Sequence, residues 1–170
     1  MSLLPLAAPR IVSIPETRHL VWATRSPTPP PFAKLGGTTL ARRLGLQYET
    51  AWHDFANSRW HEAYEQNPWY TYREAHSSTQ RWAQPDGLIL LPGQRVVVVE
   101  VKRKFTRHAQ KLWSLYVPIL KLIYPSLTVS GLLVVNWFDP AESGPIPFFV
   151  GSPEHAAPDR NNVFSWKPPA

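Results

Sequence analysis

A β-hairpin is predicted near the middle of the chain by the stretch Trp82-Ala-Gln-Pro-Asp-Gly-Leu-Ile-Leu-Leu-Pro-Gly-Gln-Arg-Val-Val-Val-Val-Glu-Val-Lys102. If Pro92 to Gln94 form a three-residue loop, counting back along the two antiparallel strands places Asp86 directly opposite Glu100. Both carboxylates then lie on the same face of the hairpin. A two-residue loop would send them to opposite faces, because the side-chain period of a strand is two.

Two carboxylates in this register need a positive partner. Directly opposed residues have Cβ atoms about 5 Å apart, and like charges at that spacing destabilise a sheet. Lys102 follows Glu100 by two residues and therefore lies on the same face. The run Val96 to Val99 is typical of a strand covered on both faces, so Glu100 stands at the margin of a buried strand. These positions predict a site where a divalent cation and Lys102 neutralise the pair; the alternative is a solvated salt-bridge cluster at an exposed hairpin end.

The segments Pro85-Asp86 and Glu100-Val101-Lys102 resemble the active-site signature of the PD-(D/E)xK nuclease superfamily. The resemblance implies that Asp86 and Glu100 hold Mg²⁺, with Mn²⁺ as a substitute, and that the main-chain carbonyl of Val101 is a further ligand. It implies that Lys102 orients or activates the attacking water. It also implies an α/β fold with a restriction-endonuclease-like core, in which helices flank a central mixed sheet of four to five strands.

The resemblance covers about residues 38 to 136. Upstream, the segment from Arg42 to Glu49 is similar to the helix that carries a glutamate in many members. The resemblance therefore implies that Glu49 is a further metal-binding residue. An ordinary solvated helix charge is the equal alternative for that residue. Downstream, Gln110 resembles a glutamine of RecB-like members and is expected to support catalysis.

Phosphodiester hydrolysis explains these residue types. The reaction needs a hydroxide-like nucleophile near neutral pH and neutralisation of the charge on the phosphate oxygens, and a metal ion supplies both. Mg²⁺ takes only one or two protein carboxylates and keeps several waters. The chain has no cysteine, which excludes a thiolate zinc site.

The composition indicates a folded chain, and the net charge indicates an acidic binding partner. The 170 residues are 44% hydrophobic and 18% charged, which favours a single core. The net charge of +6 favours an acidic partner, of which nucleic acid is the commonest, and the nuclease resemblance implies that it is DNA. The absence of cysteine fits a reducing compartment, and neither a signal peptide nor a membrane span is expected. The expected location is the cytoplasm, or the host cytoplasm for a phage protein.

Prolines divide the chain into three predicted parts: an arm over 1–37, a nuclease core over 38–137 and a tail over 138–170. Little regular structure is expected in the arm beyond residues 11–14, and the tail is expected to be mostly loop with a possible edge strand at 148–150. The two proline-rich parts are candidate contacts for a protein partner or a second copy of the chain.

Within the core, periodicity predicts a helix that begins after Thr38 or Thr39, with one apolar stripe formed by Leu40, Leu44, Tyr48, Trp52 and Phe55. A second helical stretch is expected through Tyr64, followed by a first strand at Trp69–Glu74. A crossover helix is predicted over Phe105–Tyr124 with a kink at Pro118, then a central strand over Thr128–Trp137 that lies parallel to the Glu100 strand.

Candidate nucleic-acid contacts follow the signature directly: Arg103, Lys104, Arg107, His108 and Lys111. On a helix, Arg107 and Lys111 would share a face and could follow phosphates, although a solvated helix face is the usual meaning of such a run. Of the eight tryptophans, Trp82 is the candidate for a base or sugar contact, whereas Trp52, Trp113 and Trp137 fall on core stripes.

The sequence therefore predicts a Mg²⁺-dependent DNA nuclease, most simply an endonuclease, similar to the small stand-alone phage or mobile-element members of RecB-like or resolvase-like type. Two alternatives stay open. One is a DNA-binding or assembly protein that keeps the fold without catalysis, and the other is a ribonuclease that acts on structured RNA.

Overall fold

The computed structural model describes residues 10–11, 20–31, 39–105, 107–138 and 147–169, and gives only the main chain of Arg10, Ile11, Arg107 and His108. The helices are α1 (Leu40–Trp60) and α2 (Val117–Ile123), with short turns η1 (His61–Ala63), η2 (Arg107–Gln110), η3 (Leu112–Tyr116) and η5 (Pro153–His155). The strands are β1 (Arg10–Ile11), β2 (Leu20–Ser26), β3 (Tyr64–Gln66), β4 (Trp69–Glu74), β5 (Arg81–Ala83), β6 (Gly87–Leu91), β7 (Arg95–Lys104), β8 (Thr128–Trp137), β9 (Phe148–Phe149) and β10 (Asn162–Ser165).

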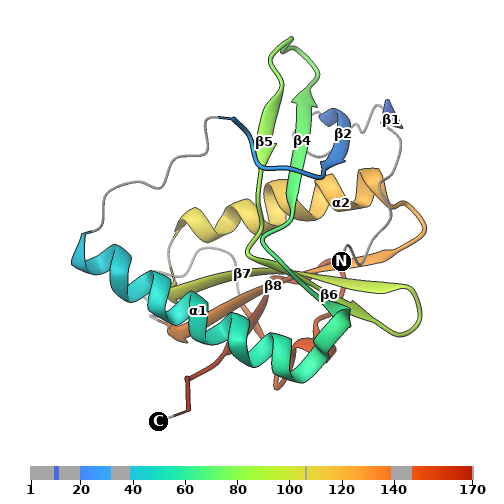
Figure 1. Ribbon diagram of the computed structural model, residues 1–170. Helices are drawn as coiled ribbons and strands as arrows, with labels where there is room; N and C mark the ends of the chain where they lie inside the picture. The colour runs from blue at the N-terminus through green and yellow to red at the C-terminus, as the bar shows by residue number, and fades with distance from the viewer. Residues whose placement is uncertain (1–9, 12–19, 32–38, 106, 139–146, 170) are drawn as a thin grey trace.

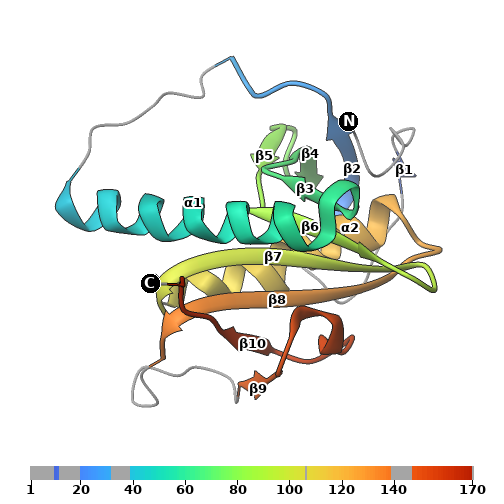
Figure 2. The same cartoon turned by 60° about the horizontal axis from the view of Figure 1, so that its bottom comes forward.

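A mixed sheet forms the centre of the molecule, and the predicted α/β class is confirmed. Its six described strands have the order β3-β6-β7-β8-β10-β9, one or two more than expected. The first three are antiparallel, whereas β7, β8, β10 and β9 are parallel. Helix α1 covers one face and α2 the other (Figures 1 and 2).

The valine run of β7 is covered on both faces, as predicted. Val97, Val99 and Val101 pack in the cluster that contains α1, whereas Val96 and Val98 pack in the cluster that contains α2. The alternation assigns a face to every later residue of the strand. Glu100, Lys102 and Lys104 therefore point to the α2 face.

The hairpin has the predicted register. Leu91 pairs with Arg95 and Gly87 with Val99, so residues 92–94 form the loop. Both Gly93 and Gln94 have positive φ angles, 76° and 57°, a conformation that is common in short hairpin loops. The first strand is shorter than predicted: β5 and β6 are separate strands, and Pro85-Asp86 lies in the break between them. The break places Asp86 one residue before β6, opposite Glu100.

Helix α1 begins where the sequence predicts. Thr39 is the N-cap, and its hydroxyl accepts a hydrogen bond from the Arg42 N–H at 3.2 Å. The predicted stripe is buried at Tyr48 and Trp52, but Leu40, in the first turn, is 64% exposed. The expected second helical stretch is wrong at Tyr64, which begins the edge strand β3.

The crossover between β7 and β8 is helical but irregular. A 3-10 turn (η2) and a π-helical turn (η3) precede α2, and the Val117 N–H bonds to the Leu112 carbonyl. Pro118 has no N–H, so it lies in the first turn of α2 instead of interrupting a continuous helix. The predicted parallel pairing of β8 with β7 is confirmed. Among the described residues, no helix is long and apolar enough to cross a membrane.

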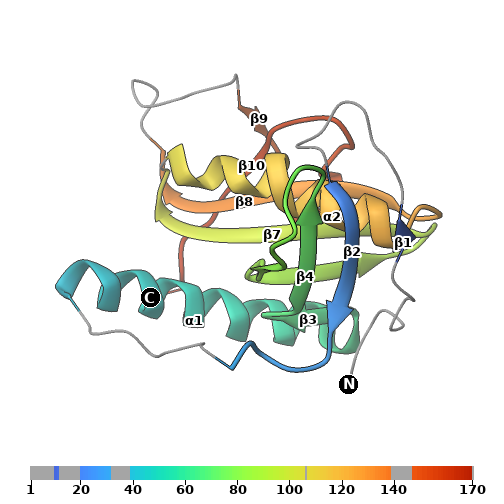
Figure 3. The ribbon, with the colours of Figure 1, turned by 90° about the horizontal axis from the view of Figure 1, so that it is seen from above.

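A second sheet, with the order β1-β2-β4-β5, corrects two predictions. Strand β4 belongs to this sheet and not to the central one, and β2 lies in the segment expected to lack regular structure. Figure 3 shows β2 and β4 side by side, running across the direction of β7 and β8. Leu20, Ala23 and Tyr70 bury their side chains in the same cluster as α2. A buried ion pair between Arg25 of β2 and Glu65 of β3 joins the two sheets.

The C-terminal segment contributes a strand to the central sheet, so the expectation of mostly loop is wrong there. Strand β10 pairs with β8 along its whole length. Asn162 is fully buried; its side chain donates to the Gly131 carbonyl at 2.9 Å and accepts from the Ala157 N–H at 3.0 Å. The Tyr48 hydroxyl of α1 donates to the Trp166 carbonyl at 2.9 Å. These contacts fix residues 157–166 against the sheet.

Candidate active site

Asp86, Glu100 and Lys102 converge on the α2 face of the central sheet. Lys102 Nζ lies 2.6 Å from Glu100 Oε1 and 3.5 Å from Asp86 Oδ2, so the two carboxylate oxygens are no further apart than the sum of these distances. The main-chain N–H of Val101 donates to Asp86 Oδ2 at 2.6 Å. The structure thus brings together the three residues that the sequence singled out.

The site is largely buried, and the pKa values of its three charged groups depend on one another. Side-chain exposure is 8% for Glu100, 15% for Asp86 and 32% for Lys102. Burial raises the pKa of Asp86 above its usual value, against the opposing effect of Lys102. Burial and the charge of Asp86 raise the pKa of Glu100 to about 7. Burial alone would lower the pKa of Lys102, but Asp86 and Glu100 outweigh it and the net pKa lies above its ordinary value, so Lys102 is a protonated ammonium.

Three oxygens of the site are suitable ligands for a hard cation. Glu100 Oε2 is buried and has no hydrogen-bond partner in the described part of the chain. Asp86 supplies a second carboxylate, and the Val101 carbonyl, which accepts from Lys102 Nζ at 3.1 Å, is a third oxygen. Two carboxylates and one carbonyl match the small number of protein ligands that Mg²⁺ usually takes, because it keeps several of its waters. The orphan Glu100 oxygen is the observation that favours such an ion, because a buried polar atom without a partner is costly.

Glu49 lies at the edge of this site and contacts a histidine. Its Oε1 lies 3.4 Å from His53 Nε2, and its charge contributes to the raised pKa of both Asp86 and Glu100. Among the described side chains, no group of three or more His, Asp or Glu residues is placed to hold a metal ion. Glu49 is therefore within electrostatic reach of the pair without completing a three-carboxylate ligand set, and its metal role stays a prediction.

A buried pair behind Asp86 was not found from the sequence. His53 Nδ1 lies 2.7 Å from the Tyr64 hydroxyl, and both residues are buried. A Cβ atom added to Gly87 would lie 2.5 Å from that hydroxyl. Tyr64 therefore fills the space that any side chain at position 87 would need, directly beside the main chain of Asp86. The adjacency His53-Asp54 gave no hint of this, because the partner of His53 comes from β3.

Tyr116 is the aromatic residue of the crossover that faces the site. Burial raises the pKa of its hydroxyl, and the negative charges of Glu100 and Asp86 raise it further. The phenol is thus neutral and able to donate a hydrogen bond near the two carboxylates. Tyr116 falls within the predicted crossover helix, and no pattern in the sequence marks it as a neighbour of the charged cluster.

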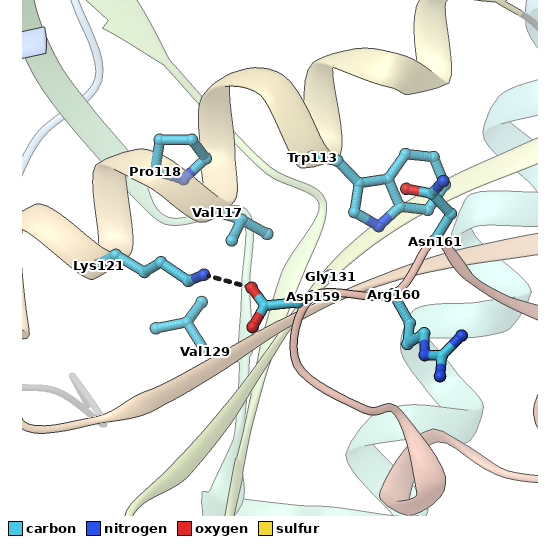
Figure 4. A pocket seen from close by; sticks show the side chains of 9 residues that line it. All are labelled: Trp113, Val117, Pro118, Lys121, Val129, Gly131, Asp159, Arg160 and Asn161. Carbon is cyan, nitrogen blue, oxygen red and sulfur yellow. Dashed lines mark hydrogen bonds and ion pairs between the residues drawn. The ribbon is translucent and has the colours of Figure 1, made fainter. Parts of the chain in front are cut away.

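Gln110 lies beside a different hollow. It is exposed and lines this hollow with Trp113, Ser114 and Asn161. A neighbouring cavity of about 380 Å³ lies between α2, β8 and the loop 159–161; Figure 4 shows Trp113, Val117 and Lys121 on its helical side. Neither lining includes Asp86, Glu100 or Lys102. The supporting role of Gln110 stays a prediction.

The structure describes the side chains of some of the predicted nucleic-acid contacts but not of all of them. Arg103, Lys104 and Lys111 are exposed, whereas the side chains of Arg107 and His108 lie outside the described ones. Residues 107–110 form a 3-10 turn and a π-helical turn follows, so the α-helical spacing that grouped Arg107 with Lys111 does not apply. Trp82 belongs to the second sheet, where its ring packs edge-on against Trp69 with centroids 6.2 Å apart.

No model of a known protein family matches the chain, and no curated protein matches it by sequence. Two solved structures match the chain in a structural comparison. One is a repair endonuclease from Pyrococcus abyssi, with 21% identity, a TM-score of 0.40, and coverage of 81% of this chain and 50% of that one. The other is the EndoMS-dsDNA2 complex, with 16% identity, a TM-score of 0.42, and coverage of 96% of this chain and 66% of that one. The chain spans about half the length of the first protein and about two thirds of the second.

Proposed function

We propose that this protein is a Mg²⁺-dependent DNA nuclease that hydrolyses phosphodiester bonds, with Mn²⁺ able to replace Mg²⁺. The observation that carries the proposal is the single ammonium group of Lys102 in contact with two largely buried carboxylates, one of which has an orphan oxygen.

Asp86 and Glu100 are the residues that would hold the metal ion, together with the carbonyl of Val101. The Val101 N–H holds Asp86 Oδ2, so the carboxylate is oriented before any ligand arrives. When bound, Mg²⁺ supplies charge neutralisation for the phosphate and a water of lowered pKa.

Lys102 would orient the attacking water or contact the phosphate. In the metal-free protein its raised pKa keeps it protonated, as a cation and hydrogen-bond donor. Tyr116, as a neutral phenol near the same carboxylates, is a second donor available to a phosphate oxygen. Both side chains can bind an anionic substrate without losing a proton.

Nucleic acid is the substrate class that the charge of the chain favours, and DNA is the one that we propose. The net charge is +6, and the exposed Arg103 and Lys104 extend β7 directly beyond Lys102. Phosphate contacts of this kind position a nucleic acid without reading its sequence. Endonucleolytic cleavage is part of the proposal.

A cleavage assay tests the proposal. Supercoiled, linear, single-stranded and four-way-junction DNA, with structured RNA as a further arm, are incubated with Mg²⁺, Mn²⁺, Ca²⁺ or EDTA. Mg²⁺ and Mn²⁺ should support cleavage, and EDTA should abolish it. Ca²⁺ should support binding but little cleavage, because its coordination is larger and looser.

Three variants give the assay its specificity. Glu100→Gln and Lys102→Met should each lower the rate at least about a hundredfold. Lys121→Met is the matched control, because Lys121 also pairs with an aspartate, Asp159, at 3.0 Å but outside the site. Full activity of Glu100→Gln would refute the assignment, and preferential cleavage of RNA would favour the ribonuclease. Metal-dependent binding without cleavage of any substrate would favour a binding protein.

A further inference from the structure

Trp137 lies on the same face of the sheet as the candidate active site. It is the last residue of β8 and pairs directly with Lys104 of β7. Glu100, Lys102 and Lys104 are every second residue of β7, so their side chains share the α2 face. The register places Trp137 beside Lys104 on that face. Two residues along a strand span about 7 Å, so the Lys104–Trp137 pair is one step beyond Lys102.

The tryptophan is held in place and yet open to solvent. Its carbonyl accepts a hydrogen bond from the Phe105 N–H at 3.2 Å, so the pairing of β7 with β8 continues past the end of the strand. Its side chain is nevertheless 53% exposed. The sequence predicted a core position for Trp137, and that prediction is wrong, because the buried cluster on this face includes Leu133 and Val135 of β8 but not Trp137.

A cation lies over the indole ring. Lys104 Nζ is 5.0 Å from the ring centroid of Trp137. An exposed aromatic ring next to a basic side chain is the combination that binds single-stranded nucleic acid: the ring stacks on a base, and the cation attracts the neighbouring phosphate. A base in an intact duplex has both faces occupied, so a stacking ring selects an unpaired nucleotide.

We infer that Trp137 and Lys104 form a binding site for an unpaired nucleotide of the DNA, adjacent to the phosphate that is cleaved. This inference rests on the proposed function and specifies its substrate: DNA with a single-stranded segment at the active site. Trp137 stacks on the base, and Lys104 contacts the backbone.

Other exposed aromatic residues fit this role less well. Phe148 and Phe149 belong to β9, at the far edge of the sheet, with β10 and β8 between them and β7. The ring of Phe149 packs edge-on against Phe138 at 5.1 Å. Phe149 is nonetheless 54% exposed, nearly the same as Trp137. It therefore provides a control with matched exposure.

A binding experiment tests the inference without requiring cleavage. In a Glu100→Gln background with Ca²⁺ present, fluorescence anisotropy gives the Kd for a single strand, a blunt duplex, and a duplex with a single-stranded tail. Trp137→Ala should weaken binding of the two substrates with unpaired bases about 5- to 100-fold, as expected for the loss of one stacked base, and change duplex binding less. Trp137→Phe should retain most of the affinity, and Phe149→Ala should bind like the parent.

An abasic scan identifies the stacked base. A series of single strands, each with one abasic site, should show one position at which the parent loses affinity, and Trp137→Ala should not respond to that position. Equal affinities of parent and Trp137→Ala across the whole series would overturn the inference while leaving the nuclease proposal intact. Failure of the parent to bind any nucleic acid would overturn both.

Discussion

The main-chain N–H of Val101 donates a hydrogen bond of 2.6 Å to Asp86 Oδ2, and this contact fixes the first carboxylate of the site relative to the strand that carries the second. Asp86 therefore has two roles: it supplies the negative charge that a metal ion needs, and its Oδ2 accepts the hydrogen bond from the Val101 N–H. Substitutions can separate these roles. Asn keeps an oxygen acceptor but removes the charge, whereas Ala removes both.

For Asp86→Asn we expect cleavage to fall at least about a hundredfold while the melting temperature stays near that of the parent. Asp86→Ala should lose activity and also stability, by about 1–3 kcal/mol, because the Val101 N–H loses its partner. Cleavage rates and thermal unfolding in parallel check this. Wild-type activity in Asp86→Asn would show that the charge is not required.

The pH dependence of stability follows from Glu100. Its pKa is raised from the ordinary glutamate value of 4.5 to about 7 in the folded protein. A carboxyl with a raised folded-state pKa contributes stability that is fully present below pH 4.5 and is lost as the pH rises through 7. The free energy of unfolding of the metal-free protein should therefore decrease across this window, and the decrease should be smaller in Glu100→Gln. Denaturant unfolding at several pH values measures it, and identical profiles for the two proteins would contradict it.

Gly87 is required by its contact with Tyr64. An added Cβ would lie 2.5 Å from the Tyr64 hydroxyl, which lies 2.7 Å from His53 Nδ1. Gly87→Ala should cost about 1–3 kcal/mol of stability because one side chain must move. The cost should be smaller in a Tyr64→Ala background. Gly45→Ala, where no atom lies within 4 Å, should instead stabilise α1 by about 0.5–1 kcal/mol. Urea denaturation compares the variants, and equal costs in both backgrounds would show that Tyr64 is not the obstacle.

The ion pair between Arg25 and Glu65 should be sensitive to the loss of one partner. The two side chains are only 6% and 13% exposed. Arg25→Met should destabilise the protein by about 3–5 kcal/mol because it leaves Glu65 buried without its cation. The double variant Arg25→Met, Glu65→Met should recover much of that loss. A double-mutant cycle by denaturant unfolding measures the coupling, and strictly additive effects would show that the pair does not act as a unit.

Local sequence patterns were sufficient for the hairpin and for α1. The loop at residues 92–94 sets the register, and a period of two then puts Asp86, Glu100 and Lys102 on one face. Thr39 caps a helix whose stripe includes Tyr48 and Trp52. These features depend on residues close together in the chain, so spacing alone determines them.

Contacts between distant segments decided the rest. Sequence determined that Trp69–Glu74 is a strand, but only the packing of Leu20, Ala23 and Tyr70 against α2 placed it in a second sheet. Alternation likewise determines the face of a residue but not how far the covering layer extends. Trp137 is therefore exposed where its pattern predicted burial, and Tyr116 of the crossover lies close enough to Glu100 and Asp86 for their charges to raise its pKa. The sequence by itself determined the three charged residues of the site, because the hairpin register places Asp86, Glu100 and Lys102 side by side. The surroundings of the site depend on tertiary packing, because they are formed by segments far apart in the sequence.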